Sequence, residues 1–372
     1  MIAQPFSFLI ITLLLTMNSC QKEDLINLDE VEIAYTFPEE SEAHEGTWLQ
    51  WPHHYEYGID FRNDIEQTWI DMTKALIQSE KVHIIAYNQI EKQRIEGILN
   101  VANVSLAQVD FFVIENDDFW IRDNGPIFVR DLEGNLVIQD WGFNGWGNKT
   151  SFEKCDRIPS KIGIAIGKPV IDLNDIMVNE GGSVEMDGYG TLLACKSSII
   201  NNNRNPGMTQ NKVEAIFKEY LGVSNFVWLE GVKGSDITDM HIDGFARFAN
   251  STTIVSMSSN DLDYWYVTPS DETILKSARN IDGEAYQIIE IPLTQNEVIT
   301  TYGTNEGKAS YINYYIGNTV VLVPNYGDPN DAIANNIIQN IYPNRTVIGI
   351  ESKNVYALGG MVHCSTQQQP LE

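Results

Sequence analysis

Apolar residues recur along the chain in short runs that each follow a turn residue. Each run opens with a small or polar residue and continues with alternating or consecutive apolar positions, as a strand entered from a turn does. The last four runs begin 56, 60 and 67 residues apart, which indicates a repeated unit. The predicted strands are residues 45–51, 134–138, 190–194, 250–255 and 317–323.

Helices are predicted between these strands. One covers residues 62–79, and another is capped by Thr209 and stopped by Gly222. A third opens at residues 328–329 and is expected to bury Ile333, Ile337, Ile338 and Ile341. Strands that alternate with helices indicate an α/β fold, and repeated units around an axis would gather their loops at one end.

Composition bounds the size and the partners of the protein. The chain has 372 residues, 43% of them apolar, and no linker interrupts residues 33–372, so we expect a single domain. Its formal charge of −27, from 51 acidic and 24 basic residues, argues against nucleic acid or an anionic membrane surface as a direct partner. The charge suits a cationic ligand, and it equally suits solubility alone.

The N-terminus is typical of a bacterial lipoprotein signal. Residues 6–17 form an apolar run of twelve residues, too short to span a bilayer, and it ends at Ser19-Cys20 before a polar stretch. We therefore expect a signal peptide at residues 1–19, a lipid on Cys20, a tether at 20–32 and export to the cell envelope, with membrane contact only through the lipid. Because residues 1–5 carry no Lys or Arg, a plain secretory signal and a free tether stay open.

The remaining cysteines suggest a nucleophile. Outside the cytoplasm, the odd number formed by Cys155, Cys195 and Cys364 leaves at least one free thiol, and Cys155 and Cys195 can pair. Cys364 follows Gly359-Gly360, which let backbone approach a ligand closely, so its thiol is a candidate nucleophile. Taken alone, a cysteine of this kind is more often an ordinary buried thiol, and only the combination with other segments favours the nucleophile.

Other segments offer the partners that such a thiol needs. If residues 240–248 are extended, His241 and Asp243 share one face and can serve as base and substrate anchor. A surface histidine beside an acid is the plain alternative. A metal site is another, with ligands Asp236, Asp239, His241 and Asp243.

A second acidic segment covers residues 117–126. Its carboxylates flank Trp120, and a carboxylate beside an indole face suits a planar cation; an acidic turn with one core tryptophan is the alternative. Glu180, which precedes Gly181-Gly182, can orient a histidine through the ring nitrogen that transfers no proton.

Together these motifs resemble the agmatine deiminases, a family that includes the bacterial type of peptidyl-arginine deiminase. The resemblance implies a pentein fold, an α/β propeller of five ββαβ-like blades around a pseudo-fivefold axis. The matching motifs run in the family's order from residue 38 to residue 370. They are residues 37–40, 44–52, 120–126, 141–147, 179–183, 203–206, 236–243, 327–331 and 363–370.

The resemblance also implies roles for individual residues. Cys364 would be the nucleophile and His241 the general acid and base. Asp123 and Asp243 would hold the guanidinium, and Glu180 would orient His241 or add to the anionic cradle. Neither a metal nor an organic cofactor is implied. The substrate pocket would include Trp120, Asn313, Gly359 and Gly360.

Three positions depart from the family pattern without removing a catalytic group. Ser41 stands where an aromatic residue is usual, Met240 where glycine often precedes the histidine, and Met361 where asparagine commonly follows Gly-Gly. These changes bear on the size and polarity of the pocket, so they bear on substrate identity more than on reaction type.

The predicted activity is hydrolysis of agmatine to N-carbamoylputrescine and ammonia through a covalent thiouronium on the cysteine. The alternative substrate is peptidyl arginine; no basic cluster lies near the motifs to meet a peptide carboxylate, and Arg130 and Arg204 are the nearby candidates. A noncatalytic surface lipoprotein that binds cations is the alternative from another class. A homodimer is common among similar proteins.

Overall fold

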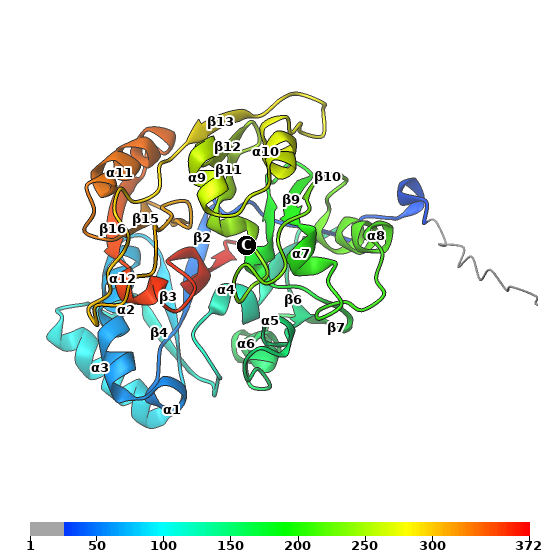
Figure 1. The fold of residues 1–372 in the computed structure, drawn as a ribbon. Coiled ribbons are helices and arrows are strands. Elements are labelled where there is room, and N and C mark those ends of the chain that lie inside the picture. The colour runs from blue at the N-terminus through cyan, green and yellow to red at the C-terminus, as the bar shows by residue number, and fades with distance from the viewer. Residues whose placement is uncertain (1–25) are drawn as a thin grey trace, which may run out of the picture.

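The computed structural model describes residues 26–372 (Figure 1). The predicted signal peptide and Cys20 lie outside these residues. Within them, no helix has the length and apolar character needed to cross a bilayer. Residues 26–30, the C-terminal part of the predicted tether, contact helix α8: the Lys218 ammonium donates to the Leu28 carbonyl at 2.7 Å.

The secondary structure alternates short strands with helices. The strands are β1 Tyr35–Thr36, β2 His44–Gln50, β3 Lys81–Ala86, β4 Val109–Val113, β5 Ile127–Asp131, β6 Leu136–Gly142, β7 Val170–Val178, β8 Val184–Met186, β9 Thr191–Cys195, β10 Asn225–Leu229, β11 Ala246–Asn250, β12 Thr253–Ser256, β13 Gln287–Glu290, β14 Tyr315–Ile316, β15 Val320–Asn325, β16 Thr346–Glu351 and β17 Gln367–Pro370.

The α-helices are α1 His54–Tyr57, α2 Ile59–Leu76, α3 Gln89–Val101, α4 Ile121–Asn124, α5 Gly145–Asn148, α6 Ile158–Ile166, α7 Lys196–Ile199, α8 Gln210–Leu221, α9 Ser259–Tyr264, α10 Pro269–Lys276, α11 Asn330–Ile341 and α12 Lys353–Tyr356. The 3₁₀ turns are η1 Leu28–Glu30, η2 Leu106–Gln108, η3 Cys155–Arg157, η4 Gly181–Ser183, η5 Ile242–Gly244 and η6 His363–Ser365.

The strands form five sheets with one shared pattern. In each, a central strand pairs antiparallel on one side and parallel on the other. The sheet orders are β1-β5-β6-β7, β10-β9-β8, β11-β12-β13, β14-β15-β16 and β17-β2-β3-β4. The last sheet joins the C-terminal strand to the first long strand, so the two ends of the domain close on each other.

The five predicted strands correspond to β2, β6, β9, β12 and β15, the central strand of each sheet. The turn residue ahead of four of them lies in or beside the connection from the antiparallel partner. Gly134 and Gly190 adopt φ of 86° and 110° there, backbone conformations that glycine adopts without strain. The repeat seen in the sequence is therefore a repeated hairpin followed by a parallel crossover.

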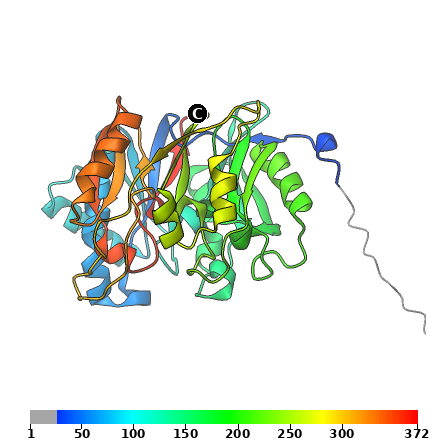
Figure 2. The ribbon, with the colours of Figure 1, turned by 45° about the horizontal axis from the view of Figure 1, so that its top comes forward.

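The predicted helices are α2, α8 and α11, and α8 and α11 lie on the outer side of the strands in both views (Figures 1 and 2). Thr209 caps α8 by accepting from the Lys212 amide, and Gly222 ends it in the left-handed region. The burial predicted for Ile333 is wrong, because Ala334 and Ile338 face inward and Ile333 stays 49% exposed. Ile337 and Ile341 pack at the edge of the core.

The disulfide that the sequence left open does not form. Cys155 and Cys195 are free thiols buried in two different apolar clusters. Each behaves as a small core residue.

Replacing Thr209 by alanine should lower the free energy of unfolding by about 1 kcal/mol, because the first turn of α8 loses its side-chain acceptor. Urea unfolding followed by circular dichroism measures the change. Thr209→Ser keeps the acceptor oxygen and should stay close to the parent protein. Equal losses in the two variants would show that the methyl group, and not the cap, stabilises this helix end.

Candidate active site

Five chain segments bring polar side chains together just ahead of five strands. Each lies two to four residues before the antiparallel strand of its own sheet, which is β5, β8, β11, β14 or β17. Because the sheets share one topology, these positions are equivalent from sheet to sheet. The residues are Asp123, Glu180, Asp243, Asn313 and Cys364.

The Cys364 thiol lies in turn η6, half-buried. Its Sγ is 3.7 Å from Asp243 Oδ2 and 3.5 Å from Asn313 Oδ1. Asn313 Oδ1 also accepts from the His363 amide at 3.0 Å, so the asparagine holds the turn that carries the thiol. A Cβ on Gly360 would lie 2.5 Å from the Trp120 ring and 3.1 Å from Cys364 Cβ, which restricts that position to glycine.

His241 lies between two carboxylates. Its Nε2 is 2.7 Å from Glu180 Oε2, and its Nδ1 is 3.6 Å from Asp123 Oδ1. Glu180 thus contacts the ring nitrogen that faces away from Asp123, which is the geometry expected of a residue that orients the histidine.

Residues 240–248 do not form one extended strand: β11 begins only at Ala246, so the condition under which His241 and Asp243 would share a strand face is not met. Asp239 and Met240 adopt φ of 61° and 77°, and the chain then enters the 3₁₀ turn η5, which contains Asp243. Asp236 Oδ1 accepts the Thr238 and Met240 amides, which stabilises the bend. Glycine adopts the backbone conformation of Met240 without strain, which explains why the family often has glycine there.

One carboxylate of this bend, that of Asp239, binds two cationic side chains of the protein itself. Asp239 Oδ2 accepts from Arg204 at 2.5 Å and from Lys149 at 2.8 Å. Arg204 also binds Glu180 through Nε at 2.7 Å. Across residues 26–372, no cluster of three or more His, Cys, Asp or Glu side chains is arranged to hold a metal ion, and Asp239 serves Arg204 instead.

Asp123 is fixed by two donors. Its Oδ2 accepts from the Trp146 indole at 2.9 Å, and its Oδ1 accepts from the Gly182 amide at 3.0 Å. A Cβ on Gly182 would lie 2.8 Å from both Asp123 Oδ1 and His241 Nδ1. Sequence reasoning assigned no role to Trp146, although it lies in the family motif at residues 141–147.

The two other acids of the 117–126 segment have structural contacts. Asp117 Oδ2 accepts the Lys154 amide at 2.7 Å, and Asp118 Oδ1 accepts the Trp120 amide at 2.8 Å. Asp123 is therefore the acid of this segment that faces His241.

Burial and charge set the ionisation of the site. Burial lowers the pKa of His241, but Asp123, Glu180 and Asp243 outweigh it and raise that pKa to about 9. The imidazole is therefore an imidazolium at neutral pH. Burial, followed by the charges of Asp243 and Asp123, raises the pKa of the Cys364 thiol well above its usual value.

The carboxylates differ in their pKa shifts. Burial raises the pKa of Asp123, and His241 only partly opposes it. Burial also acts on Glu180 and Asp243, but His241 and Arg204 lower the pKa of Glu180, and His363 lowers that of Asp243. Glu180 and Asp243 therefore remain ionised in the buried site.

A cavity of about 810 Å³ opens onto the thiol. Of the predicted residues, His241, Asp243, Asn313, Gly359 and Cys364 line it, and Asp123, Glu180, Trp120 and Gly360 are buried directly beside these lining residues. Its other charged lining residues are Asp236, Asp263, Glu306 and Lys308. Three consecutive aromatic residues also line it: Tyr264, Trp265 and Tyr266.

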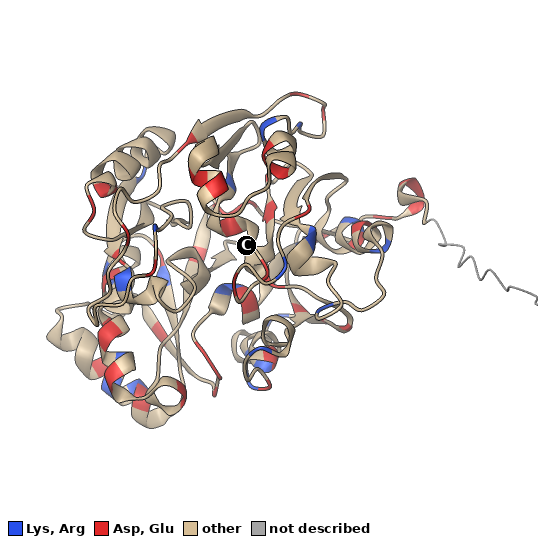
Figure 3. Ribbon diagram, viewed as in Figure 1, with Lys and Arg blue, Asp and Glu red and all other residues tan. Residues whose placement is uncertain are grey.

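The basic residues considered for a peptide carboxylate are occupied. Arg204 is buried against Glu180 and Asp239, and Arg130 binds Glu42 on the surface at 2.9 Å. In the ribbon of Figure 3, segments coloured for acidic and for basic residues both lie around the C-terminus, in the middle of the view.

Comparison with known proteins finds similar chains and similar structures. The chain is 30% identical to the agmatine deiminase of Pseudomonas aeruginosa (strain LESB58) over 359 residues, 90% of this chain and 95% of that one. The agmatine deiminase of Enterococcus faecalis superposes with a TM-score of 0.81 at 25% identity, covering 91% and 98% of the two chains. A cysteine-to-serine variant of the C. jejuni agmatine deiminase, solved with substrate bound, gives 0.79 at 26% identity and covers 90% and 96%.

The family model described as Porphyromonas-type peptidyl-arginine deiminase matches residues 36–370. That match spans all five segments of the site and nearly all of the described residues. The chain belongs to the Porphyromonas-type peptidyl-arginine deiminase family.

Proposed function

We propose that this protein is an agmatine deiminase that uses Cys364 as its nucleophile. The observation that carries the proposal is the meeting of a thiol, an imidazolium and buried carboxylates at one cavity. Similar chains named agmatine deiminases support the choice of substrate. A noncatalytic cation-binding protein has no need for a cysteine 3.7 Å from the carboxylate of Asp243, which would bind the cation.

Binding begins with the guanidinium of agmatine. The ion is planar and stays protonated at any relevant pH. Asp123 and Asp243 take its N–H groups, which fixes the plane and presents the carbon to Cys364. The positive charge of the substrate also lowers the thiol pKa, so the thiol ionises when the substrate arrives.

Two displacements then follow at the guanidinium carbon. The Cys364 thiolate forms an S–C bond, His241 donates a proton to the departing nitrogen, and ammonia leaves with the C–N bond. A thiouronium remains on Cys364. Neutral His241 then takes a proton from water, the hydroxide adds to the carbon, and the S–C bond breaks as the hydroxyl proton passes to the departing sulfur. N-carbamoylputrescine and a free cysteine result.

The charges on the cavity wall favour a substrate with two positive charges. Asp236, Asp263 and Glu306 line the cavity beyond Asp243, against the single Lys308. The distal ammonium of agmatine gains from these carboxylates, whereas the carboxylate of free arginine meets repulsion. Peptidyl arginine is the second candidate, because the family description names that activity and Lys308 offers one cation to a peptide carboxylate.

Two further proposals concern the arrangement of the sheets and the location of the protein. The shared topology of the five sheets supports their arrangement as the blades of a pentein propeller around a common axis.

The apolar run before Cys20 supports export and a lipid anchor in the cell envelope. Labelling of Cys20 with a radioactive fatty acid in a bacterial host, lost in Cys20→Ala, tests the anchor.

Ammonia and ureido release from agmatine, free arginine and a peptide that ends in arginine, measured in parallel on the chain starting at Gln21, tests the function. Agmatine should be the preferred substrate, and Cys364→Ala should abolish its turnover while keeping the parent's circular dichroism spectrum. Turnover of the peptide alone would replace the proposal with citrullination. Turnover of none of the three would reject the guanidine substrates considered.

Alkylation of Cys364 by iodoacetamide should be slow at neutral pH and should keep rising above pH 9, because burial and two carboxylates raise the thiol pKa. Asp123→Asn removes one of these charges, so the rise of its alkylation rate with pH should begin at lower pH. Asp118→Asn is the control in the same segment and should not move this rise. A rise that is unchanged in Asp123→Asn would show that Asp123 does not act on the thiol.

The same Asp123→Asn variant should lose about 10²-fold or more in kcat/KM for agmatine, because it loses a charge that stabilises the transition state. Steady-state ammonia release measures this loss, with Asp118→Asn as the control. Faster alkylation together with slower catalysis is the expected pair of results. Near-normal turnover of Asp123→Asn would remove Asp123 from the reaction.

A further inference from the structure

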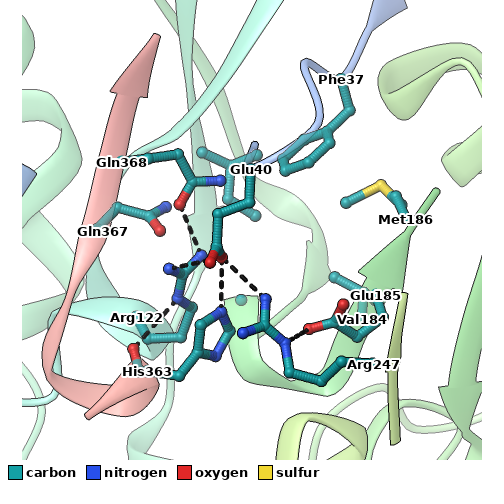
Figure 4. Close-up of a pocket in the computed structure, with 12 residues that line it drawn as sticks. Phe37, Glu40, Arg122, Val184, Glu185, Met186, Arg247, His363, Gln367 and Gln368 are labelled. Carbon is teal, nitrogen blue, oxygen red and sulfur yellow. Dashed lines mark hydrogen bonds and ion pairs between the residues drawn. The ribbon is translucent and has the colours of Figure 1, made fainter. Parts of the chain in front are cut away.

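A network of buried charged side chains lies behind the thiol, and the mechanism above gives it no task (Figure 4). It surrounds a cavity of about 30 Å³, the size of one water molecule. Removing charges from water is costly unless each one finds a partner. The members are Glu40, Arg122, Glu185, Arg247 and His363.

His363 joins this network to the active site. Its Nδ1 is 2.7 Å from Asp243 Oδ2, and its Nε2 is 2.9 Å from Glu40 Oε2. Ionised carboxylates only accept hydrogen bonds, so the ring serves both by donating from both nitrogens. A histidine that donates at both nitrogens is an imidazolium.

Both neighbours of this ring are carboxylates in the folded protein. Burial raises the pKa of Glu40, but Arg247 and His363 outweigh it and hold that pKa well below its usual value. Burial likewise acts on Asp243, where His363 is the largest opposing influence. An ionised carboxylate therefore lies at each ring nitrogen of His363.

Glu40 is itself fixed from several sides. Its Oε2 contacts Arg247 at 3.0 Å and Arg122 at 3.3 Å, and its Oε1 accepts the Ile316 amide at 2.9 Å. Arg247 in turn binds Glu185 at 2.7 Å. Charges thus alternate in sign from Glu185 through Arg247, Glu40 and His363 to Asp243, which faces the cavity.

The backbone adds a geometric constraint. His363 is bonded directly to Cys364, and its carbonyl accepts from Arg122 Nε at 3.4 Å. The contact between the His363 ring and Asp243 therefore also fixes how the thiol lies against that carboxylate, 3.7 Å apart.

We propose that His363 is a positioning residue whose cationic ring holds Asp243 ionised and fixes its Oδ2, leaving Oδ1 to receive the guanidinium. The inference rests on the proposed function for the identity of the ligand, but not for the state of the ring. The charged groups around Asp243 are His241, Arg247, Asp123 and Cys364 besides His363.

The first test compares agmatine affinity in Cys364→Ala with that in Cys364→Ala/His363→Asn, by calorimetry between pH 5 and 8. The asparagine keeps a donor near Asp243 but carries no charge. Affinity at pH 7 should fall roughly tenfold to a hundredfold, as expected for the loss of a charged hydrogen bond. The loss of affinity at low pH, called here the acid limb, should begin at higher pH in the variant with His363→Asn, because Asp243 without the cation takes up a proton more readily.

His83 supplies a matched control. It is equally buried and also lies between two carboxylates, with Nε2 at 2.7 Å from Glu45 and Nδ1 at 3.4 Å from Asp110, on strand β3. His83→Asn in the same background should change thermal stability without moving the acid limb. An acid limb for His363→Asn that coincides with that of His83→Asn would overturn the proposal.

A second measurement needs no substrate. In protein labelled with ¹⁵N-histidine, the His363 signals, assigned by their loss in His363→Asn, should show both ring nitrogens protonated at neutral pH. Glu40→Gln should weaken this state while His363 keeps its place. A neutral ring in the parent protein overturns the proposal even where agmatine turns over. An imidazolium in a protein that hydrolyses no agmatine would leave the positioning contact standing and reject only the proposed substrate.

Discussion

Three buried carboxylates repel one another, and the other residues of the active site are arranged to stabilise them. Asp123, Glu180 and Asp243 lie around one histidine and one thiol, where water cannot screen them. Each carboxylate is therefore held by a donor outside the substrate space: Trp146 for Asp123, Arg204 for Glu180 and His363 for Asp243. Ionisation of Cys364 would add one more negative charge here, and a bound guanidinium would offset it.

The fold makes such a concentration of charge possible. The acids, the amide and the thiol arrive from five sheets of one topology, each on the segment ahead of the antiparallel strand. Rigid strands on both sides restrict how far the carboxylates can move apart. The contact of β17 with β2 matters most, because it holds the C-terminal turn that carries Cys364 against the first sheet.

Much of this arrangement could be predicted from the sequence. The turn-then-strand runs located the central strand of every sheet, since periodicity and turn chemistry are local signals. Residues recognised by motif, such as Cys364, His241 and Glu180, do lie together. The resemblance to the family identified those residues as one site, whereas the motifs taken singly offered them only as candidate site residues.

What the sequence did not predict depends on long-range packing. The bend at Asp239 and Met240 is stabilised by the side chain of Asp236, and two left-handed residues in succession have no signature in the pattern. Trp146 and His363 were visible only as members of motifs. Their contacts with Asp123 and Asp243 join positions 23 and 120 residues apart. Which face of α11 is buried likewise depends on how the helix lies against its sheet.

The central claim is that the reaction passes through a covalent bond to Cys364. Acid quenching during agmatine turnover, followed by intact-protein and peptide mass spectrometry, tests it directly. The account predicts a species heavier by agmatine less ammonia, located on the peptide that contains Cys364 and absent from Cys364→Ala. Steady turnover with an unmodified Cys364 at every quench time, including times shorter than one turnover, would contradict it.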